Sequence, residues 1–235
     1  MFCYIPAQKR GQTQVGWLTS YHTFPFGLYQ NAKLKNFGVL QAINDNTFSS
    51  GGGANMHPQS DMEMLCIILD GRLEHKDSLG KRAVLKPGDI QLTSAGKEIY
   101  HSELNASHNH SLRFLQVWIS PSAKGLSPAY DKKRFSRSKL LGKLCLIASA
   151  QEKKTSLHIN QDCKIFRSLL SINKEISFLA TNIHKYWLHI ISGSLDINGE
   201  LLSAGDGFGI GDESLLIKLR GSATETDFLL FELPA

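Results

Sequence analysis

The sequence predicts an all-β protein built from two antiparallel barrels of the same kind. Short apolar segments are separated by turn residues about every ten positions, which is typical of antiparallel sandwiches and barrels. A pattern of spaced glycines also occurs twice, at Gly71 and Gly88 and again at Gly193 and Gly205. Because glycine adopts positive φ without steric cost, a repeated hairpin glycine predicts a repeated turn.

The first half has the clearest strand patterns. Its longest apolar run is typical of a strand buried on both faces, and it ends at Asp70-Gly71, a hairpin signal. Further turns are predicted at residues 77–80 and 86–89. The predicted strands cover residues 37–46, 62–69, 73–75, 90–92 and 112–119. In the second half, a shorter hairpin at residues 197–200 accounts for the closer spacing of the repeated glycines.

The composition indicates a globular protein. Hydrophobic residues make up 42% of the 235 residues and charged residues 20%. No apolar run approaches the roughly 20 residues that span a bilayer, so we expect no membrane segment. The N-terminus lacks a signal-peptide pattern, so we expect a cytoplasmic protein. Cys66 lies in an apolar strand pattern and is expected to be a buried thiol in a reducing compartment.

The net charge of +5 is concentrated in one segment. Against Asp131, this segment carries Lys132, Lys133, Arg134, Arg137, Lys139 and Lys143. The first interpretation is a solvated linker containing a short helix or turn; the alternative is a contact with an acidic protein partner. Nucleic acid is not expected, because interleaved aromatic residues and a DNA-binding motif are lacking. We therefore expect a first barrel at residues 1–125, a basic linker at 126–143 and a second barrel at 144–235.

Two pairs of polar residues carry the candidate chemistry. In a strand, residues i and i+2 face the same side, so His101 projects with Glu103 and His57 projects with Gln59. If the two strands meet inside a barrel, four side chains converge. Two imidazoles and one carboxylate suit non-haem Fe(II) with open positions for O₂ or substrate, and imidazole also suits Ni, Cu and Zn.

The glycine frames around these pairs resemble the two cupin motifs, and the chain more narrowly resembles the pirin family, including its bacterial quercetin dioxygenases. The words that carry the resemblance span residues 16–135: Gly16-Trp17-Leu18, Tyr21-His22-Thr23-Phe24, Phe37-Gly38-Val39-Leu40, Ile43-Asn44-Asp45, His57-Pro58, Asp61-Met62-Glu63, Ser94-Ala95-Gly96, His101-Ser102-Glu103 and Pro128-x-Tyr130. The second half is similar only in its barrel-like pattern. The resemblance implies a bicupin, that is, two double-stranded β-helix barrels.

The resemblance also implies one divalent transition metal held by three histidines and a glutamate. Three of these positions fall on His57, His101 and Glu103, but Gln59 stands where the family usually has histidine. A neutral amide oxygen is a weaker ligand than imidazole for such metals, so we expect weakened or lost metal binding. Fe(II) is the first expectation, with Ni, Cu, Mn or Zn as alternatives. The second barrel has Leu179 where the first has His57, so it is expected to hold no metal.

The activity implied by the resemblance is that of a quercetin 2,3-dioxygenase. O₂ would add across the heterocycle of a flavonol or similar small molecule while CO leaves. Glu103 would act as ligand or as general base for the 3-hydroxyl proton. The alternative is a non-catalytic binding or regulatory protein, suggested by Gln59, the basic linker and the family's eukaryotic transcriptional cofactors. A sugar-binding or other small-molecule-binding cupin is a third hypothesis, because cupins host many functions.

Overall fold

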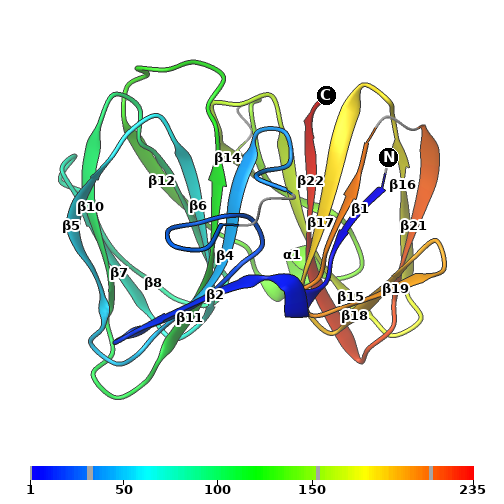
Figure 1. The fold of residues 1–235 in the computed structure, drawn as a ribbon, viewed down its shortest axis with the longest axis horizontal. Helices are drawn as coiled ribbons and strands as arrows, with labels where there is room; N and C mark the ends of the chain where they lie inside the picture. The colour runs from blue at the N-terminus through cyan, green and yellow to red at the C-terminus, as the bar shows by residue number, and fades with distance from the viewer. Residues whose placement is uncertain (1, 31–33, 152–153, 212–213) are drawn as a thin grey trace. The chain divides into compact units, whose positions relative to one another are not determined.

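The computed structural model describes residues 2–30, 34–151, 154–211 and 214–235. The chain divides into two compact units, each built almost wholly of strands (Figure 1). The first unit, here the N-terminal barrel, comprises Gly11–Arg134 and Leu157–Gln161. The second unit, here the C-terminal barrel, comprises the described residues of Met1–Arg10, Phe135–Ser156 and Asp162–Ala235.

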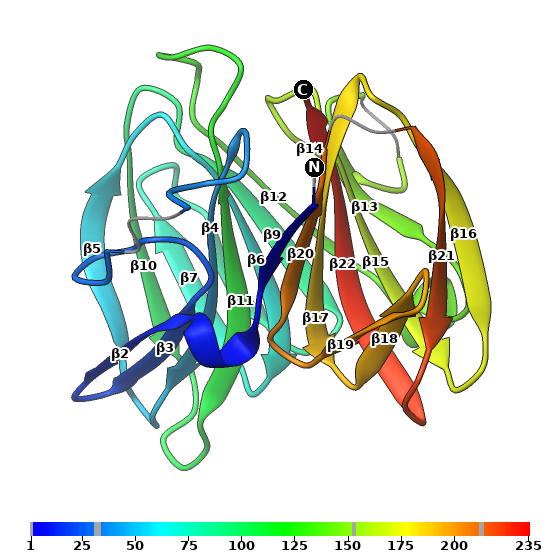
Figure 2. The same ribbon diagram turned by 45° about the vertical axis from the view of Figure 1, so that its right-hand side comes forward.

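The N-terminal barrel has two antiparallel sheets (Figure 2). Its elements are β2 Gly11–Val15, β3 Leu18–His22, β4 Leu40–Phe48, β5 Gly53–Gln59, β6 Glu63–Asp70, β7 Leu73–Asp77, β8 Arg82–Leu85, β9 Asp89–Ser94, β10 Ile99–Asn105, β11 Leu112–Ile119, β12 Ala129–Arg134 and the two-residue β14 Leu157–His158. The larger sheet has the order β12-β9-β6-β11-β4-β3-β2, and the smaller has the order β5-β10-β7-β8. The predicted strands are therefore present, with ends shifted by a few residues.

An apolar cluster joins the two sheets of this barrel. Ile68 and Phe114 from the larger sheet are buried together with Leu73 and Leu85 from the smaller sheet. Burying one such side chain stabilises the fold by about 1.5–3 kcal/mol. Residues 63–68 of β6 are all buried, as the near-continuous apolar run predicts. Cys66 belongs to this cluster as a free thiol, which confirms its expected burial.

The C-terminal barrel repeats the plan of two antiparallel sheets. Its elements are β1 Phe2–Ile5, η1 Ala7–Lys9, α1 Arg137–Leu140, β13 Cys145–Ser149, β15 Lys164–Ser171, β16 Glu175–Ala180, β17 His184–Ser192, β18 Ser194–Ile197, β19 Glu200–Ser203, β20 Gly207–Ile210, β21 Leu215–Gly221 and β22 Glu225–Pro234. The order β1-β20-β17-β22-β15-β13 forms one sheet of this unit, and β16-β21-β18-β19 forms the other.

The glycine repeat corresponds to a repeated turn. Gly71 has φ +77° and Gly193 has φ +75°. A Cβ atom at Gly71 would lie 2.4 Å from the Ser111 carbonyl oxygen, and one at Gly193 would lie 2.3 Å from the Glu225 carbonyl oxygen. Each turn therefore excludes a side chain for the same two reasons, left-handed backbone and a facing carbonyl. The two barrels share this turn as the sequence predicts.

The boundaries of the units differ from the expected division at residues 125 and 143. Residues 129–134, expected in a linker, form edge strand β12 beside β9, and the Tyr130 side chain packs on the apolar cluster of the N-terminal barrel. The lysines and arginine of this strand lie on a sheet edge, where charged side chains hinder pairing with a strand of another molecule. Helix α1 belongs to the C-terminal barrel.

The N-terminal strand also lies outside its expected unit. Strand β1 pairs with β20 in the C-terminal barrel, whereas the sequence predicts a first barrel that begins at residue 1. Asp206 fixes this segment, because its carboxylate accepts hydrogen bonds from the Tyr4 hydroxyl at 3.0 Å and from the Ala7 N–H at 2.7 Å. In the described residues, no helix combines the length and the apolarity that a bilayer crossing requires.

Candidate metal centre and its cavity

One face of the smaller sheet of the N-terminal barrel gathers the candidate residues. Strand β10 lies between β5 and β7, so His101 pairs with His57 on one side and with Asp77 on the other. Glu103 pairs with His75. Because side chains two residues apart share a face, these side chains form a polar row on one side of the sheet. The predicted convergence of β5 and β10 is therefore present.

His101 is at the centre of the row. Its ring centroid lies 4.5 Å from that of His57 and 6.0 Å from that of His75. Both of its ring nitrogens are buried, and neither has a hydrogen-bond partner among the described residues. Burial, and then the proximity of His57 and His75, lowers the pKa of His101 to about 4. The ring is thus neutral at pH 7, with a free lone pair in the interior, as a metal ligand requires.

The Glu103 carboxylate is held at both oxygens. Gln91 Nε2 donates to Oε1 at 3.0 Å, and Gln116 Nε2 donates to Oε2 at 2.9 Å. Gln91 is itself fixed, because its Oε1 accepts a hydrogen bond from the Tyr130 hydroxyl at 3.1 Å. Burial raises the pKa of Glu103 to about 7, although the two amide hydrogen bonds act to lower it. The carboxyl group is therefore poised to take up or release a proton near neutral pH.

His57 and Gln59 reach the same place from β5. The Nδ1 atom of His57 lies 2.8 Å from the Asn55 carbonyl oxygen. A carbonyl oxygen only accepts, so Nδ1 carries the proton and Nε2 keeps its lone pair, the arrangement typical of a ligating histidine. Gln59 lines the same cavity as His57, His101 and Glu103. The structure thus brings all four sequence-predicted residues to one cavity.

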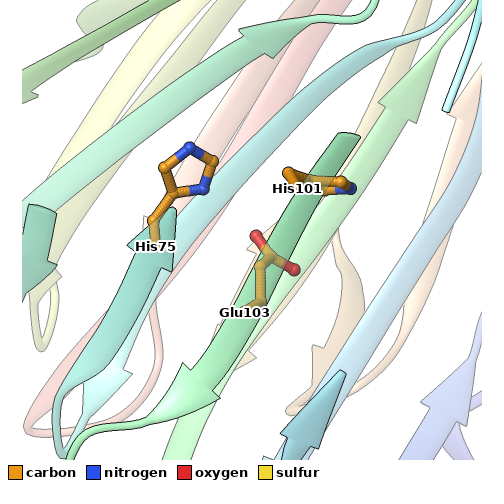
Figure 3. A group of neighbouring side chains, drawn as sticks. All are labelled: His75, His101 and Glu103. Atoms are coloured by element: carbon orange, nitrogen blue, oxygen red, sulfur yellow. The ribbon is translucent and has the colours of Figure 1, made fainter. Parts of the chain in front are cut away.

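His75 is a neighbour of the site that the sequence pattern does not predict. One donor atom from each of His75, His101 and Glu103 lies within 4.8 Å of the other two. Figure 3 shows the Glu103 carboxylate turned towards the space between the two imidazole rings. His75 Nε2 lies 3.0 Å from Asp77 Oδ2, and His75 Nδ1 is buried without a partner in the described part of the chain. In the sequence, the one feature that could have indicated His75 is its spacing of two residues from Asp77 after the Gly71 turn, which places both side chains on one face of a strand.

The donor set fits a divalent transition metal. Neutral imidazoles and a carboxylate are ligands that first-row metals accept together. A metal would satisfy the lone-pair nitrogen of the neutral His101 ring, which is buried and has no partner among the described residues; an unsatisfied buried polar atom costs about 1–3 kcal/mol.

A cavity of about 440 Å³ opens beside these residues. Two aromatic pairs form part of its wall: Trp17 contacts Phe48 edge-on with ring centroids 4.7 Å apart, and Phe26 contacts Trp118 edge-on at 5.0 Å. The volume lies in the range of about 300–1,000 Å³ that is usual for small-molecule sites. The cavity lining comprises Thr13, Trp17, Leu18, Ser20, His22, Phe26, Gly27, Leu28, Asn44, Asn46, Phe48, Ala54, His57, Gln59, His101, Glu103, Gln116 and Trp118.

The cavity of the C-terminal barrel differs in its lining from that of the N-terminal barrel. The C-terminal cavity, of about 430 Å³, is lined mainly by apolar residues such as Phe2, Leu201 and Phe208. Leu179, at the position that corresponds to His57, is 65% exposed on β16. Among the residues that the structure describes, no metal-sized group of histidine, cysteine and acidic residues lies in this barrel. The group of possible metal ligands found among the described residues therefore lies in the N-terminal barrel.

Comparisons with known proteins identify the family of the chain. A family profile described as Pirin matches residues 6–119, and one described as Quercetinase C-terminal cupin domain matches residues 146–233. The chain is 36% identical over 229 residues to the quercetin 2,3-dioxygenase of Escherichia coli K12, covering 97% of this chain and 96% of that protein. It is 32% identical over 212 residues to a pirin-like protein of Caulobacter vibrioides, covering 90% and 91%.

A solved structure of the same kind matches along the whole chain. The crystal structure of the bacterial pirin YhhW from Escherichia coli in complex with nickel(II) superposes with a TM-score of 0.93 at 35% identity. The match covers 100% of this chain and 99% of that one. The chain is therefore a bicupin that belongs to the pirin family, as its sequence motifs, its two cupin barrels and these similarities together show.

Proposed function

We propose that this protein is a metal-dependent dioxygenase that cleaves flavonols of the quercetin type. The observation that carries the proposal is the pairing of buried, partner-free His101 with the poised Glu103 carboxylate beside an aromatic cavity of about 440 Å³. The similarity to a quercetin 2,3-dioxygenase over 97% of the chain supports this function over the regulatory alternative. A protein partner at residues 126–143 and a cytoplasmic location stay predictions.

His57, Gln59, His101 and Glu103 are the proposed metal-facing residues. His57 lines the cavity and directs Nε2 away from the Asn55 carbonyl, whereas His75 is fully buried and does not line the cavity. A metal on the His57 side therefore keeps positions open to substrate, which an enzyme site needs. His75 then acts from behind, where its hydrogen bond to Asp77 fixes its ring next to Glu103.

The metal is proposed to be a divalent first-row ion. Fe(II) is the first candidate from the two-histidine, one-carboxylate set, and the nickel(II) complex of YhhW makes Ni(II) the second candidate to test. His57, His101 and Glu103, with Gln59 beside them, would hold this metal, which would supply a Lewis acid that polarises substrate oxygens.

The chain's own residues orient the substrate and move one proton. The aromatic walls admit a planar ligand and exclude water around it. Glu103, with its pKa near 7, accepts the proton of the flavonol 3-hydroxyl at a carboxylate oxygen that Gln91 or Gln116 already holds in place. Deprotonation converts the hydroxyl into the enolate that the oxygenation of a flavonol requires.

Reconstitution tests the proposal directly. Purified protein is loaded anaerobically with Fe(II), Ni(II), Cu(II) or Mn(II), then mixed with quercetin in air-saturated buffer while O₂ uptake and CO release are recorded. We expect equal amounts of O₂ consumed and CO released with at least one metal, and loss of both in Glu103→Gln. Folded, metal-loaded protein without turnover would overturn the proposal. A folded protein whose thermal midpoint ignores every metal would favour the regulatory alternative.

A further inference from the structure

Strand β4 carries two amides into the cavity at positions where a barrel interior is usually apolar. Asn44 and Asn46 are two residues apart on one face of the strand, and both are buried while lining the cavity. Burying an amide without compensating hydrogen bonds costs about 1–3 kcal/mol. The partners of these two side chains therefore reveal which of their atoms are committed to the fold.

Each amide oxygen is occupied by a neighbour on β3. His22 Nδ1 lies 2.8 Å from Asn44 Oδ1, and the Ser20 hydroxyl donates to Asn46 Oδ1 at 2.6 Å. Thr13 Oγ1 lies 2.8 Å from His22 Nε2, so the tautomer with the proton on Nδ1 satisfies the whole chain of contacts. Among the described residues, neither Nδ2 group has a hydrogen-bond partner. Both are pure donors, and both belong to residues of the cavity wall.

The strand register sets the distance between these two donors and Glu103. Gln116 donates to Glu103 from β11, and Gln116 pairs with Asn44 on the adjacent strand. Adjacent strands are about 4.8 Å apart, and two residues along a strand span about 6.8 Å. Along β4, Asn44 is therefore the nearer of the two amides to Glu103, and Asn46 lies farther away. The distance between the two residues is similar to the length of one aromatic ring with its substituents.

The cavity wall next to Asn44 suits a flat ligand. Phe26 stacks on the His22 ring with centroids 5.5 Å apart, and it meets Trp118 edge-on. From these observations we propose that Asn44 and Asn46 form a donor subsite that recognises oxygen substituents on the substrate ring remote from the chelating oxygens. This inference rests on the proposed function and specifies its substrate class as flavonols with a hydroxylated pendant ring.

Two flavonols test the subsite: quercetin, whose pendant ring carries two hydroxyls, and galangin, whose pendant ring carries none. Binding to the full-length protein is measured anaerobically by quenching of tryptophan fluorescence, since Trp17 and Trp118 line the cavity. Asn46→Asp keeps an oxygen that accepts from Ser20 but removes the donor, and Asn46→Leu removes the donor without adding charge. The matched control is Thr47→Ala, on the opposite face of β4.

We expect both Asn46 variants to bind quercetin about tenfold more weakly, the effect of one lost hydrogen bond, and to bind galangin as the parent does. Thr47→Ala should bind both flavonols like the parent. Equal weakening for the two flavonols, no weakening for either, or no saturable binding of quercetin would overturn the subsite. Turnover is recorded separately: discrimination in binding without O₂ uptake would overturn the dioxygenase and leave the subsite standing.

Discussion

His57 and His101 lie directly opposite each other on adjacent strands, with ring centroids 4.5 Å apart and ring planes inclined at 45°. The Asn55 carbonyl fixes the His57 ring, and burial keeps the His101 ring neutral. Two imidazoles are thus preorganised as a pair, and Gln59 follows on the same face of β5. The strength of metal binding at the proposed centre therefore depends on the residue at position 59.

Replacing Gln59 by histidine should strengthen metal binding. An imidazole nitrogen is a stronger donor to first-row metals than an amide oxygen, and we expect Gln59→His to bind Ni(II) about 10–100-fold more tightly. Competition with a chromophoric chelator measures the affinity. Met56→His is the matched control, because Met56 is 53% exposed on the opposite face of β5. If both variants, or neither, gain affinity, the role assigned to residue 59 is wrong.

Removing His57 should harm metal binding more than removing His75. His57 faces the cavity with a free Nε2, whereas His75 is engaged by Asp77 and acts from behind Glu103. We expect His57→Ala to lose more than about 100-fold in Ni(II) affinity and His75→Ala to lose about tenfold, the usual scale for a supporting residue. The visible spectrum of the Co(II)-loaded protein reports the coordination of each variant. A reversed order would place the metal among His75, His101 and Glu103 instead.

The sequence predicts the barrels and the His101-Glu103 pair because both depend on local pattern. Turn glycines mark Gly71 and Gly193, and the period of two along a strand places His101 and Glu103 together. The role of His75 depends on the register between β7 and β10, which no local pattern specifies. The same holds for β12, whose basic residues indicate a linker as readily as a protected sheet edge.

Metal affinity should depend on pH through Glu103. Its pKa of about 7 means that, below this pH, a metal must displace the carboxyl proton, so this group makes affinity rise about tenfold per pH unit up to pH 7 and then level off. His101, with a pKa of about 4, is already neutral in this range, so the metal displaces no proton from it. Chelator competition from pH 5.5 to 8.5 measures the profile.

Gln116→Leu provides the control for this profile. Gln116 donates a hydrogen bond that favours the ionised form of Glu103, so its loss should raise the pKa of that carboxyl group further. We expect the levelling point to move to higher pH in this variant. A parent profile that is flat between pH 5.5 and 7, or a variant profile that moves to lower pH, would contradict the assignment of the titrating group to Glu103.

Asp206→Ala should destabilise the C-terminal barrel without affecting the metal. The buried Asp206 carboxylate accepts hydrogen bonds from the Tyr4 hydroxyl, the Ala7 N–H and the Ser203 N–H, the last at 2.8 Å. Hydrogen bonds to a charged group contribute about 1.5–3 kcal/mol each, and part of this is regained from water, so we expect a loss of about 3 kcal/mol. At about 2–4 °C per kcal/mol, the calorimetric transition should fall by about 6–12 °C.

Glu200→Ala, at an exposed position of β19, should leave the transition temperature unchanged. Nickel affinity should stay at the parent value, because the proposed ligands all lie in the N-terminal barrel. An equally small fall of the transition temperature in both variants would contradict this role. It would mean that backbone pairing alone holds strand β1 to β20.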